Sequence, residues 1–131
     1  MKKKKKKRRK AKRLNEYNRW IFLFLGNYRQ AIDYINQALI IIKIEFGDKH
    51  YKYGMFLNSL GLAYAMINDY KIAYIHSKQA LQTLLNSLGS NHIEVCDVYS
   101  NLGDICMKFV IELDEQKQKY QSEKLSKLDE A

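Results

Sequence analysis

The chain is 131 residues long and carries 23 Lys and Arg against 14 Asp and Glu, a net charge of +9. Eleven of the basic residues lie within residues 1–13, and the other 12 are balanced by the 14 acidic residues, so the charge does not mark the whole chain as a nucleic-acid-binding protein. No apolar run approaches the roughly 18 to 20 residues that span a bilayer. The apolar run after the basic start is only six residues long, so the sequence also predicts no secretion signal.

Residues 1–13 form a basic tail that contains no acidic residue. Because like charges at this density repel one another, we expect the tail to be disordered on its own. It is a solvated segment, a nuclear-import signal, or an arm that binds the phosphates of nucleic acid or acidic lipid. No aromatic side chain is interleaved with the charges, so any contact with nucleic acid would be electrostatic and without sequence preference.

The rest of the chain is predicted to be helical, because its apolar residues recur at intervals of three and four, as in Ala31, Ile35 and Ala38. The expected helices, in chain order, cover residues 14–25, 28–46, 51–67, 70–88, 93–108 and about 111–128. The turns between them contain Gly26-Asn27, Gly47 to His50, Asn68-Asp69 and Gly89 to His92. Long helices joined by short turns run antiparallel. The sequence therefore predicts an all-α fold of about six helices.

An internal repeat of 42 residues relates these helices to one another. Residues 26–64 align with residues 68–106 without a gap and share nine identities in 39 positions. The identical pairs are Tyr28 and Tyr70, Ala31 and Ala73, Gln37 and Gln79, Ala38 and Ala80, Leu39 and Leu81, Gly47 and Gly89, His50 and His92, Leu60 and Leu102, and Gly61 and Gly103. The repeat unit is therefore a helical hairpin.

The pattern of Asn or Gly followed by Asp or Asn and Tyr, then Ala, Ala-Leu, Gly-x-x-His and Leu-Gly is similar to the longer tetratricopeptide repeats of kinesin light chains. The resemblance covers about residues 14–109. It implies a right-handed α-solenoid of antiparallel helix pairs over residues 14–128, with units at about 14–46, 51–88 and 93–128. It also implies that small residues let paired helices approach closely. These residues are Ala31, Ala38, Gly61, Ala73, Ala80 and Gly103.

The sequence departs from this family pattern at several positions. Tyr51 and Ile93 stand where the family usually carries Pro, and Asn18-Arg19 replaces the expected Leu-Gly of the first unit. Beyond Phe109 the register fails as well. We therefore expect the first and last units to be degenerate, the last one ending in a polar helix that caps the solenoid.

The histidines are the first candidates for site chemistry. His50 and His92 recur at the repeat period just before two predicted helices, which favours hydrogen bonding or packing at the helix start. His92 and Cys96 are four residues apart and could face one metal ion, but a structural zinc needs four ligands, and no Cys-x-x-Cys or second His joins them. His76 has no catalytic companion at a suggestive spacing. We predict no catalytic, cofactor-binding or metal-binding residues, hence no enzyme.

The resemblance implies a concave, partner-binding wall formed by the first helix of each pair. In the middle unit the exposed positions would be Met55, Asn58, Leu62, Ala65 and Met66. In the third unit they would be Asp97, Ser100, Asp104, Met107 and Lys108, and in the first unit Arg13, Glu16, Trp20, Leu23 and Phe24. Met side chains are adaptable contacts, so this wall would suit an extended or helical peptide. The alternative, that these residues only pack, stays open.

We therefore predict a protein-interaction scaffold or adaptor whose partner is a protein or peptide. The alternatives are polyanion binding through the basic tail, with nucleic acid or acidic lipid as counterpart, and a fragment of a larger scaffold. A monomer or one part of a larger assembly is expected.

Cys96 and Cys106 are about 15 Å apart along one predicted helix, too far for a disulfide. Two unpaired thiols favour a reducing compartment, the cytoplasm or alternatively the nucleus.

Overall fold

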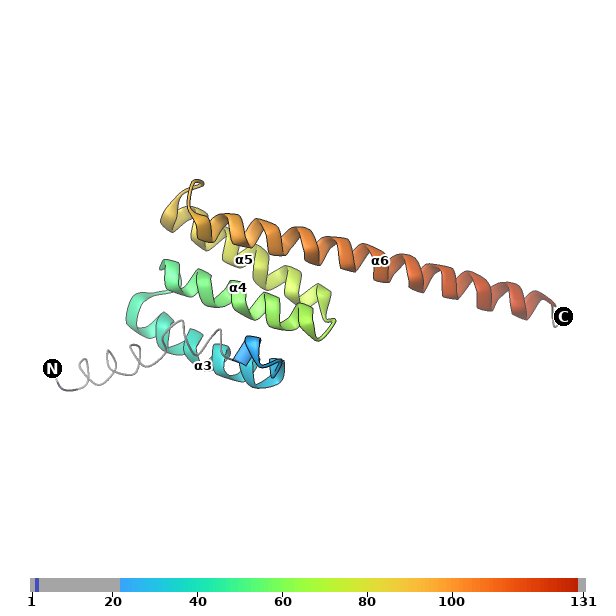
Figure 1. The fold of residues 1–131 in the computed structure, drawn as a ribbon, viewed down its shortest axis with the longest axis horizontal. Coiled ribbons are helices and arrows are strands. Elements are labelled where there is room, and N and C mark those ends of the chain that lie inside the picture. Colours follow the sequence, from blue (N-terminus) through green and yellow to red (C-terminus); the bar gives the residue numbers. More distant parts are fainter. Residues whose placement is uncertain (1, 3–21, 130–131) are drawn as a thin grey trace.

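The computed structural model describes residue 2 and residues 22–129, which are helical apart from short turns and contain no strand over those ranges (Figure 1). Four helices follow one another in chain order: α3 (Tyr28–Phe46), α4 (Tyr51–Met66), α5 (Tyr70–Leu88) and α6 (Ile93–Asp129). Residues 22–24 are also helical, as expected for the end of the first predicted helix. The remainder of that helix, with Glu16 and Trp20, lies outside the described residues, as does Arg13. So does the basic tail apart from Lys2.

Left-handed backbone conformations stop the helices where the sequence places its turns. Gly47 and Gly89, at the ends of α3 and α5, have φ values of +89° and +80°, and Asn68 after α4 has +66°. Glycine adopts this region without a Cβ clash, and Asn tolerates it better than most other residues. The turn residues therefore fix the points at which the chain reverses.

The helices stack so that α4 is covered on several sides. It packs against α3 and α5 and, over a shorter stretch, against α6, while α5 packs against α6 (Figure 1). The largest fully buried apolar side chains come from four helices: Ile35, Leu60, Leu84, Val95 and Val98. Every residue of α4 from Gly54 to Gly61 is buried. The core thus lies around α4.

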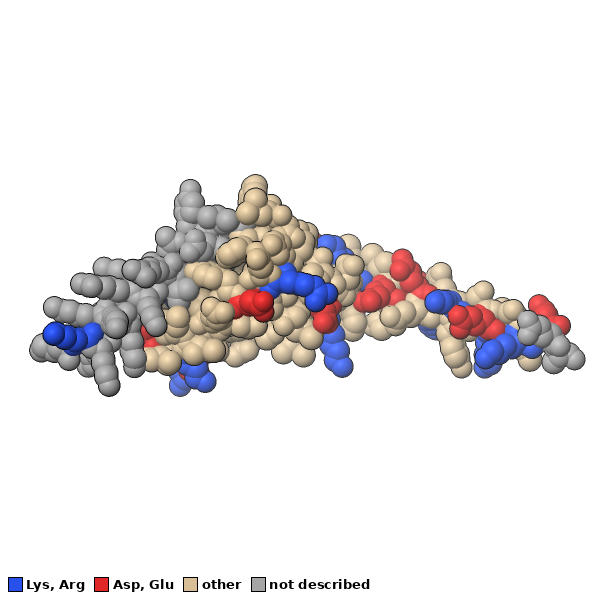
Figure 2. All heavy atoms as spheres, turned by 90° about the horizontal axis from the view of Figure 1, so that it is seen from below, with Lys and Arg blue, Asp and Glu red and all other residues tan. Residues whose placement is uncertain are grey.

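The predicted break between residues 108 and 111 is wrong, because α6 is one uninterrupted helix of 37 residues. Its physical reason is visible in the sequence, since residues 107–113 contain no Gly, Pro, Asn or Asp that would favour a turn. Past the start of α5, the helix continues alone (Figure 1), and residues 113–129 are all exposed. Acidic and basic side chains are mixed along this projecting part (Figure 2). The third unit therefore has a first helix but, among the described residues, no second helix packed back on it.

The small residues of the repeat differ in what surrounds them. Ala31, Ala38, Ala73 and Ala80 are completely buried. A Cβ added to Gly61 would overlap Ser77 Oγ and lie 3.1 Å from the Ala73 carbonyl oxygen. At Gly103, by contrast, no described atom beyond the neighbouring backbone of α6 and the adjacent residues comes within 4 Å of such a Cβ. The close contact expected at Gly103 is absent because α6 does not turn back.

Gly54, which the repeat did not single out, is a second point of close approach between α4 and α5. A Cβ placed there would lie 2.8 Å from Leu84 Cγ. No identity at the repeat period marks this position, because Cys96 occupies its equivalent in the next unit. Only the contact with Leu84 reveals it.

Candidate protein-binding site

Two parallel helices, α4 and α6, are joined directly by a hydrogen bond between asparagine side chains. Asn101 Nδ2 donates to Asn58 Oδ1 at 3.0 Å. Asn58 is only 8% exposed, and a buried amide oxygen without such a partner would be costly. Sequence reasoning placed Asn58 among the exposed residues and did not consider Asn101. The bond shows which sides of the two helices face each other.

The middle-unit residues expected to be exposed divide into two groups. Met55, Asn58 and Ala65 are 4%, 8% and 6% exposed, so the expectation of exposure is wrong for all three. They are buried because α4 has neighbouring helices on more than one side. Leu62 is half-buried and Met66 is 45% exposed. Of the predicted surface on α4, only Leu62 and Met66 are accessible to a partner.

The third-unit residues Asp97, Ser100, Asp104, Met107 and Lys108 are all exposed, as expected. Three of them share the side of Asn101 because they lie four residues before it and three and seven residues after it. These three are Asp97, Asp104 and Lys108. Ser100 and Met107 are turned farther round the helix. We call the set Leu62, Met66, Asp97, Asp104 and Lys108 the α4–α6 wall.

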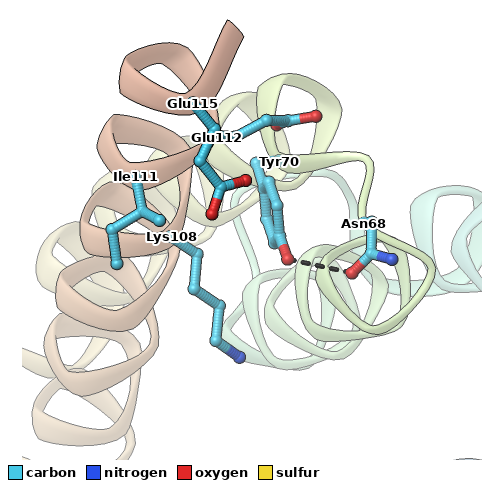
Figure 3. A pocket seen from close by; sticks show the side chains of 6 residues that line it. All are labelled: Asn68, Tyr70, Lys108, Ile111, Glu112 and Glu115. Carbon is cyan, nitrogen blue, oxygen red and sulfur yellow. Dashed lines mark hydrogen bonds between the residues drawn. The ribbon is translucent and has the colours of Figure 1, made fainter. Parts of the chain in front are cut away.

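At one end of the wall, a cavity of about 350 Å³ opens between α6 and the turn that joins α4 to α5. It is lined by Asn68, Tyr70, Lys108, Ile111, Glu112 and Glu115. Tyr70 Oη donates to Asn68 Oδ1 at 2.9 Å, opposite the Lys108 side chain (Figure 3). The repeat had marked Tyr70 only as a structural position. The cavity was not predicted because it depends on α6 continuing beyond the start of α5.

The first-unit residues that the structure describes belong partly to the core. Leu23 is half-buried and packs against the main core cluster, whereas Phe24 is 91% exposed. They come from the short helical segment at residues 22–24. We do not include them in the wall.

The recurring histidines lie at helix starts. His50 Nδ1 accepts a hydrogen bond from the Lys52 backbone N–H, and His92 Nδ1 accepts one from the Glu94 backbone N–H, both at 3.2 Å. These bonds satisfy amide groups that the first turn of a helix cannot pair internally. The His50 ring also packs against Phe46, with centroids 4.8 Å apart. Burial, and to a lesser degree the charge of Lys52, lowers the pKa of His50 below its ordinary 6.5.

His76 on α5 packs within the helical hairpin. Its ring stacks on Tyr64 with centroids 5.5 Å apart, and its buried Nδ1 has no hydrogen-bond partner among the described residues. Burial lowers the pKa of His76 below the ordinary value of 6.5, since desolvation disfavours the charged imidazolium. Within residues 22–129, no three His, Cys, Asp or Glu side chains are grouped to hold a metal ion.

The family described as Tetratricopeptide repeat matches residues 21–84 of this chain. The matched segment includes α3, α4 and most of α5. A search among curated proteins finds no match. The family match supports the prediction that this chain is a tetratricopeptide repeat protein. The fold is an all-α, tetratricopeptide-like solenoid of antiparallel helix pairs. None of the described helices is both long and apolar enough to cross a membrane.

Proposed function

We propose that this chain is an adaptor that binds an extended peptide of a partner protein along the α4–α6 wall. Tetratricopeptide repeats generally mediate protein–protein interactions, which supports the class of function. The observation that carries the particular site is the Asn58 to Asn101 hydrogen bond. It holds the accessible apolar residues of α4 beside the charged residues of α6.

The spacing of the wall suggests the chemistry of the peptide. Asp97 and Asp104 are seven residues apart on one helix, hence about 10 Å, which three residues of an extended peptide would span. In a polyproline II conformation, which repeats every three residues and rises about 3.1 Å per residue, basic side chains at positions i and i+3 would point to the same side and match the two carboxylates. Lys108, about 6 Å farther along the axis, would favour a terminal carboxylate about two residues beyond position i+3.

The apolar part of the wall would receive an apolar side chain of the same peptide. Leu62 and Met66 are four residues apart and lie on one side of α4. Methionine adapts its shape to different apolar partners. We therefore expect charge to select the peptide's register and the Leu62 and Met66 contact to supply much of the affinity.

The test is affinity capture from the native cell with the full chain and two wall variants, Leu62→Glu and Asp104→Lys. Both should lose partners that the unchanged chain retains, and a synthetic peptide of the captured partner should bind in fluorescence anisotropy with the same ranking. Ile75→Glu is the matched control, because Ile75 is a 54% exposed apolar residue on α5, away from the wall. Circular dichroism verifies the fold of each variant. If Leu62→Glu keeps every partner, the wall is not the binding site.

The basic tail provides an alternative function, supported by its eleven Lys and Arg within residues 1–13. It would bind polyanions such as nucleic acid or acidic lipid in the cytoplasm or nucleus, and the affinity would fall steeply with salt. Deletion of residues 1–13 distinguishes the two. Partner capture survives this deletion if the wall is the site, whereas the tail function predicts that capture and heparin binding disappear together.

A further inference from the structure

One side of α6 is an apolar surface that the described chain leaves uncovered. It contains Cys96, Tyr99, Gly103, Cys106, Met107 and Val110, which we call the Gly103 face. Tyr99, Met107 and Val110 are 54%, 65% and 63% exposed. Cys96, Tyr99 and Gly103 follow one another at intervals of three and four. Cys106 and Met107 lie three and four residues after Gly103, and Val110 lies seven after it, so all six residues lie on one side of the helix. None of them is charged, and they are turned away from Asp97, Asp104 and Lys108 of the wall.

The equivalent side of α4 is covered by α5, and this contact shows what the Gly103 face is built to receive. Gly61 occupies the same repeat position as Gly103, and it lies against Ser77 and the Ala73 carbonyl of α5. Ala73, Ser77 and Ala80 are all completely buried. The α4–α5 pair is therefore a helix with Gly at its contact point, packed against an antiparallel helix with small residues at i, i+4 and i+7.

Neither backbone conformation nor packing among the described residues requires a glycine at position 103. Glycine is among the poorest helix formers, and here it lies inside a long helix. Its φ is not in the left-handed region, and a Cβ would meet no described atom within 4 Å. A helix that approaches α6 as closely as α5 approaches α4 would account for the missing side chain.

We propose that the Gly103 face binds an α-helix of a partner protein, antiparallel to α6, with small uncharged residues at i, i+4 and i+7 facing Gly103. The position corresponding to Leu84 must carry a residue smaller than Leu, because Cys96 replaces the Gly54 that Leu84 contacts. A second copy of this chain would instead offer its own α6. Its Tyr99, Met107 and Val110 are bulky and would hold the two helices apart at Gly103.

The test uses the full chain extended by a flexible Gly/Ser linker and a copy of residues 70–88 that carries Leu84→Ala. The distance from Asp129 back to Gly103 is 26 residues along the helix, about 39 Å, and a linker of roughly 40 residues has a comparable mean reach. Cys96 and Cys106 are exposed free thiols, so their rates of maleimide labelling, resolved by mass spectrometry, report directly on this face.

The linker gives the appended helix an effective concentration of about 1 mM. With a dissociation constant of about 0.1 mM for the face, the helix should slow the labelling of both thiols about tenfold. The matched controls are the linker alone and the same fusion with Gly103→Leu, and both should label as fast as the unextended chain. Gly103→Leu should fold, since the site is open, and circular dichroism checks this.

Two results would overturn the proposal. One is labelling that the appended helix leaves unchanged, or slows equally in the Gly103→Leu fusion. The other is a dimer of the unextended chain in sedimentation equilibrium that Gly103→Leu dissociates, since the occupant would then be a second copy. Peptide binding at the α4–α6 wall should be unaffected by Gly103→Leu, so failure here is distinguishable from failure of the wall.

Discussion

The α4–α5 hairpin and α6 carry the same repeat position in opposite surroundings. Gly61 of α4 is pressed against α5, whereas Gly103 of α6 has no described atom near the place of a side chain. The two glycines occupy the same position of the repeat, and Leu precedes each of them. The repeat therefore specifies a surface suited to a closely packed helix. Whether a helix covers that surface depends on whether the following segment turns back, as α5 does on α4 and the end of α6 does not.

The largest effect is expected from Gly61→Ala. Although Ala favours the helix, its Cβ would overlap Ser77 Oγ and crowd the Ala73 carbonyl, which is held in the backbone of α5. We expect the free energy of unfolding to fall by about 2–3 kcal/mol, the upper part of the range for overpacked cores. Urea unfolding followed by circular dichroism measures this. An unchanged or raised stability would mean that α5 can move aside and that the glycine is not required there.

The second prediction concerns the link between the hairpin and α6. Asn101→Ala removes the donor to Asn58 Oδ1 and leaves that buried oxygen without its partner. The expected loss is about 1–2 kcal/mol in urea unfolding. Asn86→Ala on the exposed side of α5 is the matched control and should change the stability little. If the two substitutions had equal effects, the hydrogen bond between Asn101 and Asn58 would not stabilise the contact between α4 and α6.

Gly103→Ala is expected to act in the opposite direction from Gly61→Ala. Nothing obstructs the added methyl group, so only helix propensity changes, and the free energy of unfolding should rise by about 0.5–1 kcal/mol. The same urea unfolding experiment compares the two alanine variants directly. Destabilisation by Gly103→Ala in the isolated chain would show that the face is already occupied.

The smallest effect at neutral pH is expected from His76, which packs within the α4–α5 hairpin. Burial lowers the pKa of His76 in the folded state. As the pH falls below 6.5, His76 therefore binds a proton more readily in the unfolded chain than in the folded chain, and the free energy of unfolding falls. His76→Phe should remove this part of the decline between pH 7 and pH 5. Urea unfolding at a series of pH values compares the two slopes. His50 has a lowered pKa as well, so a smaller slope should remain.

The sequence predicts the repeat, the turns and three helices closely, because Gly47, Gly89 and Asn68 act through local backbone conformation. Burial is harder to predict when it depends on several neighbours at once. Met55 and Asn58 fit the pattern of an exposed wall, but packing around α4 covers them. The continuity of α6 was predictable from the missing turn residues at 107–113. The cavity at Tyr70 was not, since it requires that continuity and the position of α5 together.

Because α6 is long, its two halves should unfold and refold on two different timescales. Its first half is anchored by Val95, Val98 and Ile105, and its amides should exchange with solvent only when the core opens. Residues 113–129 are exposed throughout and rely on local bonds such as Gln118 Nε2 to Asp114 Oδ2 at 3.2 Å. Such a segment unwinds and reforms within about 1 µs. A ligand on the first half therefore meets a fixed surface, and a ligand on the second half meets an equilibrium between helix and coil.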